Sequence, residues 1–108
     1  MTDPGTLAIH ADALEDSSWR ARCTTLQTLR QLEPATLAQH ASAIVARLED
    51  SYWNVRYEAL ETLGKLEPAT LAQHAEAVIS SLEDSDWRVR REALVTLGKL
   101  EPATLAQH

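Results

Sequence analysis

The side chains of this chain that could hold a metal ion are four histidines spread along its length. They are His10, His40, His74 and His108, and the last three are spaced 34 residues apart. A zinc ion needs ring nitrogens at about 2 Å, whereas stacked helices lie about 8–10 Å apart. No Cys, Asp or Glu lies one helical turn from His40 on the same face. We therefore predict packing or capping roles for the histidines, and no metal site.

Paired carboxylates and a cysteine are the other candidates for catalytic chemistry. The Glu-Asp steps occupy residues 15–16, 49–50 and 83–84. Acid–base catalysis needs one asymmetric site rather than three equal ones, so we interpret these pairs as turn and capping residues. The single cysteine, Cys23, gives way to Tyr57 and Arg91 at 34 and 68 residues further on, which indicates a surface position. Because no recurring partner supplies a general base, the sequence predicts neither an enzyme nor a cofactor.

Aromatic residues form the third distinctive group, and all five fall within about the first two turns of a predicted helix. They are Trp19, Tyr52, Trp53, Tyr57 and Trp87. In one interpretation they fill the seam between neighbouring repeats and keep the indole N–H at the rim. In the other they form a solvent-accessible ridge that binds a protein partner, since Trp, Tyr and Arg are enriched at interface hot spots.

All of these residues are positioned by an internal repeat with a 34-residue period. Three segments begin at Leu14, Leu48 and Leu82, and over 27 aligned positions the second and third agree at 23. Each repeat contains two helical patterns. The first has an apolar stripe with the spacing i, i+4, i+5 and i+8 of one helix face. In the first repeat this stripe comprises Ala21, Thr25, Leu26, Leu29 and Leu32.

The ends of both helices carry capping signals. The first helix should begin after Ser17-Ser18, Ser51 or Ser85-Asp86 and end before Pro34, Pro68 or Pro102. The second helix has the stripe Leu37, Ala41, Ile44, Val45 and Leu48. Its start has two interpretations, because Pro34 can occupy the first turn or Thr36 and Gln39 can form a capping box.

Two amphipathic helices joined by a short turn lie antiparallel, and neither can bury its stripe alone. Stacked copies bury a continuous core, so we predict an all-α fold, a right-handed α-solenoid of antiparallel hairpins with a 34-residue period. It comprises about three repeats with truncated ends in a single domain, residues 1–108. We expect a partial second helix at residues 4–14 and an incomplete last repeat that ends at 108.

The third repeat resembles the HEAT repeat in its string Leu82-Glu83-Asp84, followed by Val89-Arg90, Ala93-Leu94 and Leu97-Gly98. A tetratricopeptide array is disfavoured because the second helix has no aromatic residue. The resemblance implies an inter-repeat hydrogen-bonded ladder of aspartates and arginines. Its members would be Asp16 and Arg22, Asp50 and Arg56, and Asp84 and Arg90. It also implies that the second helices line a concave face, where small, lightly charged residues such as Ala46, Ala77 and Ser80 offer a weaker second binding surface.

One residue departs from this pattern, because Arg30 stands where the later repeats have Gly64 and Gly98. An arginine is strained at positive φ, so we predict right-handed helical backbone at all three positions, with glycine present for close packing.

Charge and targeting features narrow the range of partners. The chain has 16 acidic and 10 basic side chains, a net charge of −6 and no basic block, which argues against nucleic acid and anionic membranes as partners. No basic region precedes an apolar run at the start, and no run of about 18 apolar residues occurs. We predict a soluble, intracellular, cytoplasmic protein.

Together these features predict a noncatalytic helical-repeat scaffold for protein–protein interaction, with protein partners of unknown identity. The alternative is a self-assembling or purely structural repeat segment without a ligand, from a longer array or a consensus-like sequence. Because no polar capping repeat is visible at either end, we also expect a homo-oligomer or an end-to-end contact through uncapped termini.

Overall fold

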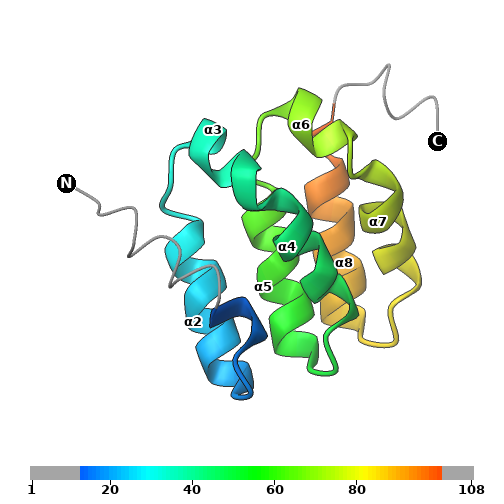
Figure 1. Cartoon of the computed structure of the whole chain (residues 1–108). Helices are drawn as coiled ribbons and strands as arrows, with labels where there is room; N and C mark the ends of the chain where they lie inside the picture. The colour runs from blue at the N-terminus through cyan, green and yellow to red at the C-terminus, as the bar shows by residue number, and fades with distance from the viewer. Residues whose placement is uncertain (1–12, 101–108) are drawn as a thin grey trace.

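The computed structural model describes residues 13–100, which contain helices and connecting turns and no strand. Three long helices begin 34 residues apart: α2 (Trp19–Leu29), α5 (Trp53–Leu63) and α8 (Trp87–Leu97). They lie side by side in one row, and α4 (Ala41–Ala46) and α7 (Ala75–Ser80) cover α5 and α8 in a second row (Figure 1). The predicted all-α architecture of stacked helical hairpins is thereby confirmed.

Shorter segments complete the second row and the turns. They are α3 (Pro34–Leu37), α6 (Pro68–Ala72) and the 3₁₀ segments η1 (Ala13–Glu15), η2 (Ala38–His40), η3 (Arg47–Glu49) and η4 (Ser81–Glu83). The partial helix predicted at residues 4–14 lies almost entirely outside the described residues, and the predicted end of the last repeat lies wholly outside them.

The predicted second helix of each repeat is divided into two α-helices, α3 and α4 in the first repeat and α6 and α7 in the second. In the first repeat it begins with Pro34 at its first turn, as one of the two interpretations had it, and Glu33 is the N-cap without a side-chain hydrogen bond. In the first repeat the α-helix is interrupted at His40, and in the second repeat it is interrupted at His74. The backbones of these two residues lie outside the helical region (φ −108°, ψ 6° and φ −117°, ψ 16°). The apolar stripe is still buried on both sides of the break, which adjusts the backbone without exposing the core.

The turns before the long helices are organised by aspartates. The carboxylates of Asp16, Asp50 and Asp84 each accept the backbone N–H two residues further on, at 2.8, 3.0 and 2.9 Å. Such short side-chain turns fix the entry into a helix. Ser18 and Asp86 then serve as N-caps, as predicted, but in the second repeat the N-cap is Tyr52. The prediction of Ser51 as a cap is wrong, because the aspartate-centred turn places the cap one residue later.

Arginines join these turns from one repeat to the next. Arg22 donates from Nε and Nη2 to the Asp50 carboxylate (2.7 and 3.0 Å) and from Nη1 to the Asp16 carbonyl (2.6 Å). Arg56 repeats the arrangement with the Asp84 carboxylate (2.8 and 3.1 Å) and the Asp50 carbonyl (2.7 Å). Each arginine therefore holds its own turn through the backbone and the next turn through the side chain. The last arginine, Arg90, donates to the Asp84 carbonyl (2.7 Å).

This ladder is partly buried and its charges stabilise one another. Burial alone would raise the pKa of Asp50, but hydrogen bonds from Arg22 and the Tyr52 amide, with the charges of Arg22 and Arg47, hold it below its usual value. The hydrogen bond to Asp50 raises the pKa of Arg22 against the opposing effect of burial. Both groups are therefore charged at neutral pH.

The position shared by Arg30, Gly64 and Gly98 is right-handed helical in all three repeats, with φ of −61°, −65° and −63°. This agrees with the prediction. A Cβ atom at Gly64 would lie 3.2 Å from Lys99 Cε, the flexible end of an exposed side chain. Arg30 instead extends toward Glu58 and Glu61 of the next repeat, at 3.2 and 3.3 Å.

Candidate functional site

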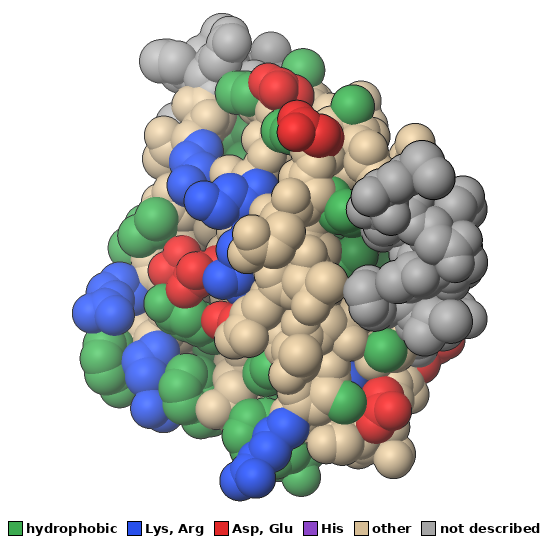
Figure 2. Space-filling model, turned by 90° about the vertical axis from the view of Figure 1, so that its left-hand side faces the viewer, with side chains coloured by type: hydrophobic (Ala, Val, Ile, Leu, Met, Phe, Trp, Pro, Cys, Tyr) green, Lys and Arg blue, Asp and Glu red, His purple; other side chains and the backbone are tan. Residues whose placement is uncertain are grey.

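The outer surface of the long-helix row contains a groove that crosses α2, α5 and α8, which we call the aromatic groove. Its volume is about 440 Å³. It is lined by Trp19, Cys23, Gln27, Trp53, Asn54, Tyr57, Glu58, Arg88 and Arg91. Hydrophobic side chains alternate with Lys and Arg side chains along the left-hand edge of the molecule in Figure 2.

The predicted aromatic ridge is divided between this groove and its rim. Trp19, Trp53 and Tyr57 are half-buried, pack against the core and line the groove. Tyr52 is 46% exposed and stacks on Trp19 (centroids 5.6 Å apart, planes at 24°), while Trp87 is 55% exposed at the start of α8. Trp19, Trp53 and Tyr57 thus pack against the core with one side and line the groove with the other, whereas Tyr52 and Trp87 lie at its rim.

Two arginines that were not assigned to the ridge from the sequence complete the groove. The Arg88 guanidinium lies 3.5 Å from the centroid of the Trp53 ring, and Arg91 lies 5.1 Å from that of Trp87. Asp86 fixes Arg88 through bonds of 3.1 and 2.9 Å to Nε and Nη2. The sequence does indicate these two positions in one way, because the residues equivalent to Arg88 and Arg91 differ among otherwise similar repeats.

The Asp86–Arg88 pair also organises the start of α8. The Asp86 carboxylate accepts from the Arg88 amide at 2.8 Å, so the same side chain caps the helix and orients the guanidinium. The hydrogen bond from the Arg88 side chain is the largest effect that lowers the pKa of Asp86, to about 2. At neutral pH the groove therefore presents a guanidinium, paired with the Asp86 carboxylate, stacked on an indole ring.

Two titratable groups inside the groove, Tyr57 and Cys23, are held in their neutral forms. A hydrogen bond to Glu61, together with burial and nearby carboxylates, raises the pKa of Tyr57 to about 12. Burial, followed by the charge of Glu58, raises the pKa of the Cys23 thiol. A thiol must ionise to act as a nucleophile, so Cys23 is poorly suited to covalent catalysis. The arrangement favours binding through ring faces, planar guanidinium groups and amides.

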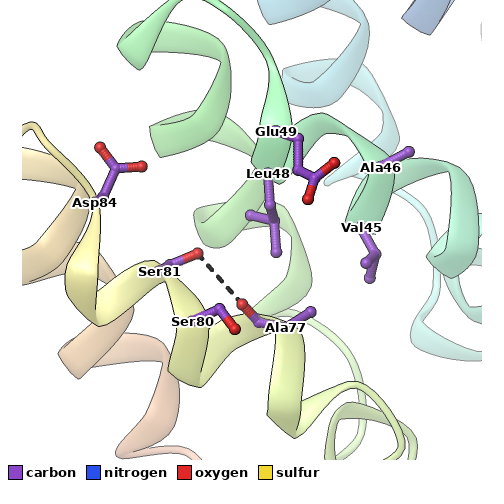
Figure 3. A pocket seen from close by; sticks show the side chains of 8 residues that line it. All are labelled: Val45, Ala46, Leu48, Glu49, Ala77, Ser80, Ser81 and Asp84. Carbon is purple, nitrogen blue, oxygen red and sulfur yellow. Dashed lines mark hydrogen bonds between the residues drawn. The ribbon is translucent and has the colours of Figure 1, made fainter.

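A second cavity lies between the short helices of two neighbouring repeats (Figure 3) and has a volume of about 450 Å³. It is lined by Val45, Ala46, Leu48, Glu49, Ala77, Ser80, Ser81 and Asp84. Its polar groups are mostly used within the protein, since the Ser81 hydroxyl donates to the Ala77 carbonyl (3.4 Å) and Arg56 holds the Asp84 carboxylate. This surface overlaps the weaker second surface expected from the sequence, and it offers few polar groups to a ligand.

In the described part of the chain, the histidines and carboxylates do not gather into a metal site. Residues 13–100 contain no group of three or more His, Cys, Asp or Glu side chains placed to hold a metal ion. His40 and His74 sit at the breaks in the second helices, and His10 and His108 lie outside the described residues. Within the same range, no helix has the length and apolar character needed to span a membrane.

The repeated long helices, their short partners and the arginine–aspartate ladder agree with the comparison of this chain with known families. The family model for HEAT repeats matches residues 41–108, more than half of the chain. The chain belongs to the HEAT repeat family. HEAT repeats generally mediate protein–protein interaction or scaffolding and are generally noncatalytic. Among curated proteins, none matches this chain.

Proposed function

We propose that this chain is a noncatalytic HEAT-repeat scaffold whose aromatic groove binds an extended segment of a partner protein. The observation that supports it most directly is the Arg88 guanidinium stacked on Trp53 and held in place by Asp86. Trp, Tyr and Arg dominate interface hot spots because they offer large contact areas at low entropic cost. Here Asp86 already holds Arg88 over Trp53 before a partner arrives, which reduces the entropic cost of binding.

The groove also has the dimensions and chemistry of a segment-binding site. It runs across three successive repeats, so a bound segment would contact aromatic rings on α2 and α5 and arginines on α8 along its length. Half-buried rings offer apolar faces, Arg91 and the Nη1 group of Arg88 offer donors for carboxylates or carbonyls, and Asn54 offers an amide, whereas the Gln27 amide donates to Glu58. A segment that alternates apolar and acidic side chains fits this lining best.

The proposal can be tested with a displayed library of random dodecapeptides selected on the wild-type protein. The selected peptides are then measured against the Arg88→Ala, Tyr57→Ala and Trp53→Ala variants. We expect a loss of affinity of about tenfold or more for Arg88→Ala and Trp53→Ala. Val95→Ala is the matched control, because Val95 is 50% exposed on α8 but does not line the groove. Undiminished binding to Arg88→Ala and Trp53→Ala, with circular dichroism unchanged, would rule out the groove as the site.

Self-association is a second candidate, favoured by one observation. Leu26 and Leu60 are fully buried, whereas the equivalent Leu94 of the third repeat is 62% exposed, beside Val95. Exposed apolar groups on an ordered helix favour association between molecules. We therefore propose an end-to-end contact that forms a homo-oligomer, as an activity separate from the groove. A molecular mass that stays monomeric from micromolar to sub-millimolar concentration would exclude it.

A further inference from the structure

The side of α8 that faces away from α5 bears residues whose equivalents in α2 and α5 contact the next repeat. We call it the carboxyl-terminal face and define it by Trp87, Arg90 and Leu94. The carbonyl of Leu26 accepts a hydrogen bond from the Thr62 hydroxyl (3.2 Å), and that of Leu60 accepts one from Thr96 (3.1 Å). Leu94 is the next member of the series, and residues 13–100 supply no such hydroxyl to its carbonyl.

Arg90 is the next member of the ladder series. Arg22 and Arg56 each use Nε and Nη2 to bind the carboxylate of the following repeat. Arg90 is exposed, and within the described part of the chain its hydrogen bond is the one from Nη1 to the Asp84 carbonyl. The two donors that face the next repeat therefore have the geometry to take a carboxylate.

Trp87 completes this face. In the preceding repeat, the equivalent Trp53 is half-buried beneath Arg88 of the following helix, at 3.5 Å from the ring centroid. Trp87 is 55% exposed, and the arginines near its ring belong to its own helix, Arg88 at 5.8 Å and Arg91 at 5.1 Å. A guanidinium from a following repeat would occupy the ring face that Arg88 occupies on Trp53.

The side of α2 that faces away from α5 bears the groups that would complement Leu94, Arg90 and Trp87. We call it the amino-terminal face and define it by Asp16, Arg20 and Thr28. The Asp16 carboxylate is exposed, and the bond it accepts among the described residues comes from the Ser18 amide in its own turn. The Thr28 hydroxyl donates to the carbonyl of Thr24 in its own helix, at 3.0 Å. Arg20, the equivalent of Arg88, lies over the Trp19 ring of its own helix, at 5.2 Å.

We propose that a second copy of this chain docks its amino-terminal face on the carboxyl-terminal face of the first, in the register of a continued array. Arg90 then binds Asp16 of the second copy, Thr28 of the second copy donates to the Leu94 carbonyl, and Arg20 of the second copy covers the Trp87 ring. This inference rests on the self-association candidate and specifies its two surfaces. The occupant follows from complementarity, since one face supplies a guanidinium whose Nε and Nη2 have no hydrogen-bond partner among residues 13–100, and the other supplies the carboxylate at the matching position.

This contact has a defined symmetry. Its two surfaces are different, so it is heterologous, and each added copy presents a new free face of each kind. Association through it is open-ended rather than limited to a dimer. We therefore expect the weight-average mass to rise steadily with concentration and to fall when salt screens the Arg90–Asp16 pair.

Charge exchange tests the register directly, with sedimentation velocity or light scattering of the full chain. Arg90→Glu and Asp16→Arg each place like charges at the contact, and we expect each to weaken association about tenfold or more. Mixing these two variants brings opposite charges together at both kinds of contact, so the mass growth returns. Lys65→Glu makes the same change in net charge as Arg90→Glu at an exposed site away from both faces and should behave as the wild type.

A further variant tests the apolar part of the contact. Leu94→Lys alone should not associate, and mixed with wild type it should limit the mass growth, because its amino-terminal face still binds but its carboxyl-terminal face does not. Because Leu94 is exposed the fold should survive, as circular dichroism will show. If the wild type associates and the charge variants associate equally well, or if their mixture does not recover, the head-to-tail register is wrong while self-association stands. If the wild type is monomeric throughout, both ideas fail, and the peptide measurements on the groove are unaffected.

Discussion

Removing the Asp50 carboxylate should destabilise the protein far more than removing the same group from the first turn. The Asp50 side chain is 3% exposed and its partner Arg22 is 10% exposed, with two hydrogen bonds between them of 2.7 and 3.0 Å. In Asp50→Ala, the buried guanidinium of Arg22 keeps its bond to the Asp16 carbonyl but has no counter-charge. Losing one partner of a buried ion pair costs about 3–5 kcal/mol.

Asp16→Ala is the matched control for this prediction. Asp16 occupies the same turn position and also accepts an amide hydrogen bond, but it is exposed and no arginine from residues 13–100 binds its carboxylate. Its loss should cost about 0.5–1.5 kcal/mol, the value of one hydrogen bond. Since small domains are stable by about 5–15 kcal/mol, only Asp50→Ala should approach the unfolding limit.

The assay is thermal and urea denaturation followed by far-ultraviolet circular dichroism. A loss of 3–5 kcal/mol lowers the melting temperature of a domain of this size by about 15–25 °C. Adding Arg22→Leu to Asp50→Ala removes the stranded charge and should recover about 1 kcal/mol or more relative to the sum of the single changes. Equal destabilisation by Asp50→Ala and Asp16→Ala would refute the reasoning, because the inter-repeat pair would then contribute nothing.

Three further predictions concern individual groups. The folded-state pKa of Asp50 lies below its unfolded value, so its contribution is present above the unfolded pKa and is lost as the pH falls through the folded one. The stability difference between wild type and Asp50→Ala should therefore shrink below about pH 4 in denaturation measurements, and a constant difference would contradict the assignment. The pKa of Tyr57, about 12, should fall when Glu61→Gln removes the charge of its partner. Absorbance titration in a Tyr52→Phe background reports this value, and an unchanged midpoint would refute the pairing. Because this pKa is raised, the contribution of neutral Tyr57 is present below the unfolded pKa and is lost as the pH rises toward 12. Gly64→Ala should stabilise the protein by about 0.4–1 kcal/mol, since the backbone there is right-handed helical and Lys99 can move aside. A loss of stability in urea denaturation would show that the contact with Lys99 is rigid.

The parts of the fold that could be predicted from sequence are those set by local pattern. The leucine stripe of α2 and α5 and the proline at the start of α3 depend on spacing and on one fixed φ, so they are visible in the chain itself. The breaks before His40 and His74 lack a proline or glycine signal. They depend on how the second row packs against the long helices, which no short window contains.

The candidate site was predictable only in its aromatic half. Trp19, Trp53 and Tyr57 follow the repeat and cluster near helix starts, which singles them out. The stacking of Arg88 on Trp53 joins residues 35 positions apart and requires the crossing of two helices to be known. The same holds for Arg22, whose carboxylate partner is Asp50 in the following repeat rather than the nearby Asp16. Contacts between repeats are fixed by the stacking geometry, which a sequence pattern does not specify.

The aspartate-centred turn has a consequence for how the gene for such a protein can change. The middle turn, at Asp50, receives a donor from Arg22 of the repeat before it, and its own repeat sends the equivalent donor, Arg56, to the turn at Asp84. An in-frame duplication or deletion of one whole repeat therefore leaves every remaining donor facing an acceptor of the right kind. Such an array can therefore gain or lose whole repeats without compensating substitutions, whereas a loss of part of a repeat would leave a buried arginine without its carboxylate.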